Sequence, residues 1–223
     1  MRATTLKAII AIVGVFATQR AHPQDAFVNL DFEQAIAPFE GYMAPIDRAL
    51  PGWRGYVAGS QISVVLYDTR NIDAACISVL DRLAPQQAWQ PLEGNYSAYL
   101  MGSTPEWPQQ QAAAIAQIGQ IPADAKSIRF LFSTTYLPQV TFEGQAIPLV
   151  LLGENTAYVT AGADVSLFAG DTGELRFTVP PQAAGGLLDN IEFSPVAIPE
   201  PTAMVLSLLG VLIVGCRVKR CRR

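Results

Sequence analysis

The sequence predicts an all-β protein, built as an antiparallel β-sandwich, and three observations support this fold class. Short runs in which apolar and polar residues alternate recur through the middle of the chain. Glycine, proline, asparagine and aspartate separate these runs, and no long helical periodicity interrupts them. The body between residues 27 and 195 spans roughly 170 residues, which suffices for one sizeable core, so we expect a single domain.

The predicted strands follow one another at short intervals along this body. They cover residues 27–33, 61–67, 76–80, 96–101, 113–121, 127–132, 140–152, 174–179 and 190–193, with a hairpin turn at 143–145 in the seventh run. Strand alternation places Ile128, Phe130 and Phe132 on one face of their strand. The same alternation points Leu175 and Phe177 inward, as expected for a strand with one buried side.

Residues 1–26 have the layout of a secretory signal peptide. Arg2 and Lys7 are basic, residues 8–17 are apolar, and residues 20–24 are polar. The chain is therefore expected to be exported, with a mature start near residues 22–27. An uncleaved N-terminal anchor is the alternative, although the apolar run is short for one.

The other end, residues 196–223, combines a polar break, an apolar run and a basic cluster. Pro199 and Pro201 break any helix before the run and leave Glu200 in an extended, accessible segment. The apolar run over about residues 202–216 would form a short transmembrane helix, below the roughly 20 residues of a comfortable span. The basic stop consists of Arg217, Lys219, Arg220, Arg222 and Arg223. A basic end tends to stay cytoplasmic, so the body would lie outside the membrane.

These three parts, in this order, resemble the PEP-CTERM sorting signal of Gram-negative bacteria. The resemblance covers residues 196–223 and rests on Pro199-Glu200-Pro201, the short apolar helix and the arginine-rich end. It implies that an exosortase, a membrane-embedded transpeptidase, recognises the tripeptide, cleaves near it and passes the protein on to the outer surface. The protein would be anchored in the inner membrane before processing and lie at the cell surface or outside the cell afterwards. An ordinary tail-anchored or single-pass protein is the alternative.

The composition of the exported body removes several classes of function. Residues 27–198 carry 17 acidic and 7 basic side chains, and such an acidic surface would repel a nucleic acid. The single histidine, His22, lies in the leader, so the body has no Ser-His-Asp, Cys-His or histidine-zinc arrangement. Cys76 is the single cysteine of the body, which excludes an internal disulfide. Its apolar surroundings predict a small buried side chain, and a cross-link between two chains is the alternative.

A second resemblance covers nearly the whole body. The segments 29–33, 164–177 and 188–193 are similar to the galactose-binding-like jelly rolls, which include many carbohydrate-binding modules. The resemblance implies a jelly-roll β-sandwich whose first and last strands lie side by side and hold a structural calcium ion. Carried over to this chain, the candidate ligands are Glu33 and Asp189, with Asp31 a weaker third. The alternative is that these carboxylates are strand-end residues that bind loop amides.

Sugar binding would require exposed aromatic rings flanked by hydrogen-bonding groups, because a pyranose presents an apolar face to a π surface. Trp53, with Arg54 and Tyr56 beside it, is the candidate loop platform. The alternative is that Trp53 closes one end of the sandwich core. Further aromatic candidates are Trp89, Tyr96, Tyr99 and Trp107. All four lie within residues 81–112, a proline-rich region that is expected to run over the surface.

These observations predict a non-enzymatic exported protein of the cell surface or extracellular matrix. An exosortase would process it, and its body would contact an exopolysaccharide. No catalytic residue is assigned, and structural calcium is the one candidate cofactor. Two alternatives stay open: a glycoside hydrolase or lyase that uses paired carboxylates, and an envelope scaffold that binds another protein.

Overall fold

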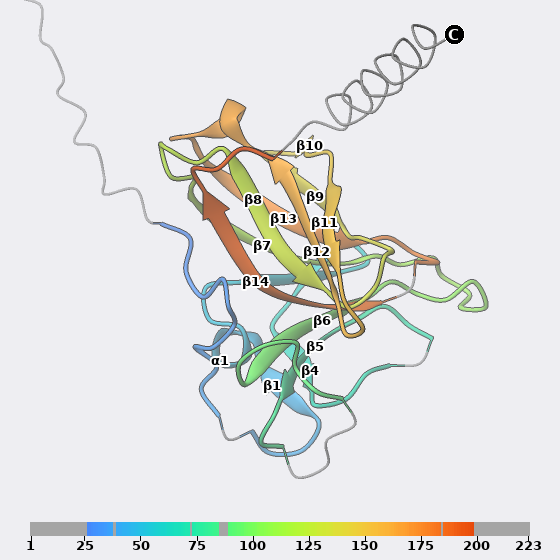
Figure 1. The fold of residues 1–223 in the computed structure, drawn as a ribbon. Helices are drawn as coiled ribbons and strands as arrows, with labels where there is room; N and C mark the ends of the chain where they lie inside the picture. Colours follow the sequence, from blue (N-terminus) through green and yellow to red (C-terminus); the bar gives the residue numbers. More distant parts are fainter. Residues whose placement is uncertain (1–25, 38, 72, 85–88, 184, 199–223) are drawn as a thin grey trace, which may run out of the picture.

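The computed structural model describes residues 26–37, 39–71, 73–84, 89–183 and 185–198. Two β-sheets pack against each other and enclose one hydrophobic core, with almost no helix (Figure 1). The predicted β-sandwich is therefore confirmed as the architecture of the body.

The smaller sheet has six strands, and every neighbouring pair in it is antiparallel. Its order is β10 (Gln145–Ala146), β9 (Gln139–Phe142), β13 (Thr172–Val179), β7 (Ala113–Gln120), β2 (Arg54–Val57) and β3 (Ser60–Ile62). The β13 and β7 strands pair along their whole length, from Thr172 opposite Gln120 to Val179 opposite Ala113. Exposure alternates along β13, and Leu175 and Phe177 face the core as predicted.

The larger sheet has eight strands and supplies the other wall of the core. Its order is β1 (Met43–Pro45), β4 (Val64–Tyr67), β5 (Cys76–Asp81), β6 (Tyr96–Met101), β14 (Gly186–Ser194), β8 (Ser127–Phe132), β12 (Val159–Asp164) and β11 (Val150–Glu154). The β4 and β5 strands are parallel, and the other neighbours are antiparallel. A single helical turn, α1 (Ile46–Ala49), follows β1, and a short 3-10 helix, η1 (Ser166–Phe168), follows β12.

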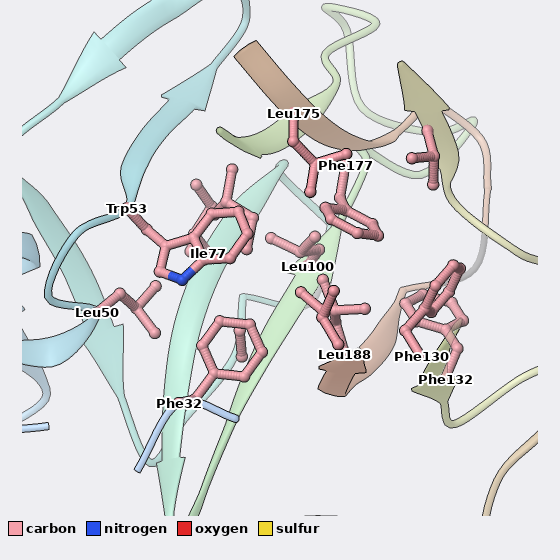
Figure 2. Close-up of a cluster of buried hydrophobic side chains, with 14 of the residues drawn as sticks. Phe32, Leu50, Trp53, Ile77, Leu100, Phe130, Phe132, Leu175, Phe177 and Leu188 are labelled. Carbon is pink, nitrogen blue, oxygen red and sulfur yellow. The ribbon is translucent and has the colours of Figure 1, made fainter. Parts of the chain in front are cut away.

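Aromatic side chains from both sheets fill the core (Figure 2). Phe130 and Phe177 meet edge to face across the sandwich, with ring centroids 5.3 Å apart. Phe32 packs against Trp53 at 5.7 Å, in the same cluster as Ile77. Each such side chain contributes about 1.5–3 kcal/mol by leaving water, so this cluster supplies a large share of the stability.

The first predicted strand is wrong in its conformation. Residues 27–33 form turns, because Asn29 and Phe32 adopt positive φ angles of 51° and 59°. The segment nevertheless lies beside β14, where the Ile191 amide donates to the Leu30 carbonyl over 2.9 Å. Phe27 also stacks on Phe193 with ring centroids 5.5 Å apart. The alternation of the segment reflects a half-buried loop.

Two other predicted strands divide between the sheets. The run 61–67 breaks at Ser63, so β3 belongs to the six-stranded sheet and β4 to the eight-stranded one. The run 140–152 forms the predicted turn, with φ of 49° at Glu143 and 75° at Gly144, but β11 then joins the other sheet. A strand that changes sheets keeps its apolar alternation, so the pattern alone could not show the crossing.

The eight-stranded sheet is also buried on part of its outer side. Cys76, Leu80, Tyr99, Met101 and Leu187 form a second cluster there, separate from the main core. Burial raises the pKa of the Cys76 thiol, as expected for a small apolar side chain. The Cys76 side chain is therefore buried within this second cluster.

The predictions for the chain ends fall on residues that the structure does not describe. These are the signal segment up to residue 25, the Pro199-Glu200-Pro201 motif, the apolar run 202–216 and the five basic residues after it. Within residues 26–198, as far as they are described, no helix combines the length and apolar character needed to cross a membrane.

Candidate functional site

Trp53 lies in the hydrophobic core, which was the alternative to a role as an exposed sugar platform. Its side chain is 3% exposed, its Nε1 donates to the Asn29 carbonyl over 3.0 Å, and its ring meets Phe177 at 6.2 Å (Figure 2). The prediction of a Trp53 sugar platform is corrected accordingly, because a ring enclosed by the core has no face for a ligand. Arg54 is exposed on β2, while the half-buried Tyr56 lies under the Arg176 guanidinium.

A different tryptophan lies at a cavity. Six residues define what we call the outer pocket, a hollow of about 450 Å³ on the outer side of the eight-stranded sheet: Arg70, Trp89, Tyr99, Ser133, Thr134 and Leu187. Tyr99 comes from β6 and Leu187 from β14, while the others lie on connections between strands. The volume falls in the range of small-ligand sites.

The aromatic wall of the outer pocket is held in place by an arginine. The Arg70 guanidinium carbon lies 3.8 Å from the centroid of the Trp89 ring, close enough for a cation-π contact. Trp89 and Tyr99 are 6.2 Å apart and tilted by 54°. Burial raises the pKa of the Tyr99 hydroxyl, and the Arg70 guanidinium acts in the opposite direction. Trp89 stays 38% exposed and Tyr99 only 4%.

Polar groups complete the rim of the outer pocket. Ser133 Oγ accepts the Leu187 amide over 2.8 Å, which fixes the serine beside β14. Gly185 also lines the pocket, and a Cβ at this position would lie 2.5 Å from the Tyr99 hydroxyl. The glycine therefore keeps the space above the tyrosine open. The pocket can offer ring surface, hydroxyl groups and a guanidinium to one ligand.

The predicted calcium ligands are engaged by hydrogen-bond donors. Glu33 Oε1 accepts the backbone amides of Asn95 and Tyr96 over 2.7 and 2.9 Å, and its Oε2 accepts the Asn95 side chain. Asp31 is exposed and accepts the Glu33 amide over 3.3 Å. Among the described residues, no group of three or more histidine, cysteine, aspartate or glutamate side chains could hold a metal ion.

Asp189 is positioned by a β-bulge in β14. Its carboxylate accepts the Ser97 hydroxyl over 2.6 Å, the Glu93 amide over 3.1 Å and the Asn190 amide over 2.7 Å. Burial raises its pKa to about 6, against the lowering effect of these hydrogen bonds. Calcium needs oxygen ligands, whereas N–H and O–H groups surround the Glu33 and Asp189 carboxylates, so this donor set fits the loop-amide alternative. Calcium binding stays a prediction.

One cluster of carboxylates has no counterpart in the sequence prediction. The Tyr67 hydroxyl donates to Asp81 Oδ2 over 2.7 Å, and burial with this bond raises the pKa of Tyr67 far above its usual value. Burial also raises the pKa of Asp68, whose Oδ1 has no hydrogen-bond partner among the described residues. The parallel pairing of β4 and β5 brings these residues together, and no spacing in the sequence signals it.

No family model and no curated protein matches this chain. Solved structures with some similarity include an apo form cyclase from Fischerella sp., at 14% identity and a TM-score of 0.40 over 78% of this chain and 98% of that one. A family 11 carbohydrate-binding module from Clostridium thermocellum, in complex with a beta-1,3-1,4-mixed-linked tetrasaccharide, is similar at 11% identity and a TM-score of 0.34 over 71% and 97%. The enzymatically active domain of Bacteriophage CBA120 tailspike protein 4 is similar at 10% identity and a TM-score of 0.35 over 64% and 19%.

The prediction of a protein without enzymatic activity is contradicted by this comparison, because cyclases and an enzymatically active tailspike domain stand among the similar structures. The absence of histidine from the body excludes histidine-dependent mechanisms alone. The absence of histidine is therefore no ground for predicting that the protein lacks enzymatic activity.

Proposed function

We propose that this chain is an exported protein whose β-sandwich binds a polysaccharide in the outer pocket. The observation that carries the proposal is the partly exposed ring of Trp89, held beside Tyr99 and Arg70 at the edge of a cavity of about 450 Å³. A sugar ring has an apolar face that packs on an aromatic surface and hydroxyl groups that need polar partners. The outer pocket offers both within one hollow.

The order of the pocket supports a binding role. Trp89 is fixed by the Arg70 guanidinium on its ring and by Tyr99 at 6.2 Å. Since these side chains are held before a ligand arrives, binding costs little additional conformational entropy. The exposed part of the indole is therefore a prearranged contact surface.

The proposal includes the organisation of the whole chain. Residues 1–26 would act as the signal peptide, residues 27–195 as a jelly-roll binding domain and residues 196–223 as the exosortase sorting signal. The sequence pattern of the two ends supports this part. Replacement of Pro199, Glu200 and Pro201 by alanine should leave the protein in the inner membrane, which cell fractionation measures. Arrival of that variant at the surface in wild-type amounts would contradict exosortase sorting.

Binding of the full-length protein to a panel of neutral and charged polysaccharides tests the proposed function. Trp89→Ala should weaken binding ~2- to 12-fold, since stacking of a ring on an aromatic face contributes on the order of 0.5–1.5 kcal/mol. Trp107→Ala is the matched control, because Trp107 lies outside the residues that line the outer pocket. Equal losses in the two variants, or binding to no polysaccharide, would overturn the proposal.

A further inference from the structure

The outer pocket has one charged lining residue, and that residue is a cation. Among the described residues that line the outer pocket, Arg70 is the only one that is an arginine, lysine, aspartate or glutamate. The body around it is acidic, with 17 acidic against 7 basic side chains over residues 27–198. A cation placed at a hollow in an acidic surface marks the point where an anionic ligand group is favoured.

Arg70 has no carboxylate partner within the described chain. The one salt bridge among the described residues joins Arg176 to Glu174 over 2.8 Å. Arg176 also stacks on an aromatic ring, at 4.1 Å from Tyr56, so it has the same stacking as Arg70 together with an ion pair. The difference leaves the positive charge of Arg70 unneutralised at the pocket.

The geometry of Arg70 suits an oxyanion. A guanidinium carries five N–H donors in a planar fork that matches two oxygens of a carboxylate or sulfate. The guanidinium carbon lies over the Trp89 ring at 3.8 Å from its centroid, and the guanidinium acts on the Tyr99 hydroxyl, whose pKa it lowers. A fork fixed in this way loses less entropy when it binds an anion.

We propose that the outer pocket selects polysaccharides whose sugar residues carry carboxylate or sulfate groups, with Arg70 binding the anionic group beside the Trp89 ring. This inference rests on the proposed function of the same pocket. It adds the chemical class of the sugar to the proposed site. The aromatic ring supplies contact with any sugar ring, while Arg70 supplies the discrimination in favour of the charged one.

The test compares polymers that differ in charge alone. Full-length protein is titrated with polygalacturonate and with its fully methyl-esterified, neutral form, and alginate and chondroitin sulfate extend the anionic set. Arg70→Gln should weaken binding to the anionic polymers at least ~10-fold, and it should weaken binding to the neutral form much less, through the loss of the contact that holds the Trp89 ring. Arg70→Lys should recover part of the loss, since it keeps the charge without the fork. Arg54→Gln removes a charge from an exposed residue of β2 and should change neither affinity.

The outcomes separate the inference from the proposed function. Tighter binding of the anionic forms that requires Arg70 and weakens with salt supports the inference. Equal binding of charged and neutral polymers that depends on Trp89, with no larger loss for the charged polymer in Arg70→Gln, overturns the inference and leaves the proposed function standing. Binding of neutral polymers alone does the same. Binding of no polysaccharide overturns both.

Discussion

The tryptophans on the two sides of the eight-stranded sheet differ in exposure and in their neighbours. On the inner side, Trp53 is 3% exposed, donates its Nε1 hydrogen to a backbone carbonyl and contacts Phe32 and Phe177. On the outer side, Trp89 is 38% exposed and contacts an arginine and a tyrosine at the edge of a hollow. The chemistry of the neighbouring side chains therefore separates a structural tryptophan from a candidate ligand-binding one. Apolar partners surround the first, and charged and polar partners surround the second.

The two tryptophans differ in exposure because the two sides of the eight-stranded sheet are covered to different extents. A second complete sheet closes the inner side, so side chains there interlock with those of six further strands. The outer side has a small cluster around Tyr99 and Leu187, with Leu66 and Leu92 packed against it. Incomplete cover leaves a hollow next to apolar residues, which is the usual setting of a ligand site.

The largest expected effect is the loss of stability on changing Trp53. Trp53→Ala should lower the free energy of unfolding by about 3–5 kcal/mol, because it opens a cavity in the core and removes a buried hydrogen bond. Trp89→Ala should cost less than ~1 kcal/mol, as expected for a partly exposed ring. Denaturant unfolding measures both. Similar costs for the two variants would contradict the division between core and pocket.

The next effect concerns the buried carboxylate of Asp189. Its pKa is raised from 3.8 to about 6 in the folded protein, so the folded state binds the proton more tightly than the unfolded state. Its contribution to stability is complete below pH ~4 and is lost as the pH rises through 6, with a total of about 3 kcal/mol. Asp189→Asn should remove this part of the dependence of the unfolding free energy on pH, while Asp68, whose pKa burial also raises, keeps a contribution of the same sign.

Asp164 provides the matched control for that prediction. Hydrogen bonds from Ser166 lower its pKa, so its contribution has the opposite sign and is lost as the pH falls through the acid range. Asp164→Asn should therefore leave the slope between pH 4 and 6 unchanged. A slope as steep in Asp189→Asn as in the wild type would show that another group carries the proton.

A smaller effect on stability and affinity is expected from a substitution at Gly185, which lines the outer pocket next to Tyr99. Gly185→Ala would place a Cβ 2.5 Å from the Tyr99 hydroxyl and 2.7 Å from the Met101 Cβ. Tyr99 must shift, so we expect a stability cost of about 1–3 kcal/mol and a several-fold loss of polysaccharide affinity. Gly153→Ala is the control, because its Cβ would meet nothing within 4 Å. Unchanged affinity in Gly185→Ala would place the ligand elsewhere.

The calcium prediction has the smallest expected signal. If Glu33 and Asp189 hold a calcium ion, millimolar calcium should raise the melting temperature by a few degrees, and Glu33→Gln should abolish the rise. If their role is to bind the loop amides of Asn95 and Tyr96, chelator and calcium should give the same melting curve. Scanning calorimetry of the full-length protein distinguishes the two results.

Much of the fold could be predicted from the sequence because strand alternation reports burial directly. The predicted strands at 96–101 and 127–132 coincide with β6 and β8. The break at Ser63 could not be predicted, since β-favouring residues stand on both sides of it while the chain passes from one sheet to the other. The turn over 27–33 was also hidden, because positive φ angles at Asn29 and Phe32 leave no apolar signature.

The candidate site was less predictable than the fold. Trp89 and Tyr99 could be named among the aromatic candidates, but the sequence favoured Trp53 because glycines and an arginine stand next to it. Arg70 could not be singled out, since it follows β4 while Trp89 lies between β5 and β6. The parallel pairing of β4 with β5 brings those connections to the same side of the sheet. Long-range pairing of this kind is not written in local spacing.

The indole N–H signals of the tryptophans test the central claim most directly. The chain has 3 tryptophans, so a ¹⁵N-labelled sample gives three indole resonances, which Trp89→Phe and Trp107→Phe assign. Titration with an oligosaccharide of the tightest-binding polysaccharide should move the Trp89 resonance and leave that of Trp53, bonded inside the core, in place. A shift of the Trp53 resonance with Trp89 unchanged would contradict binding at the outer pocket.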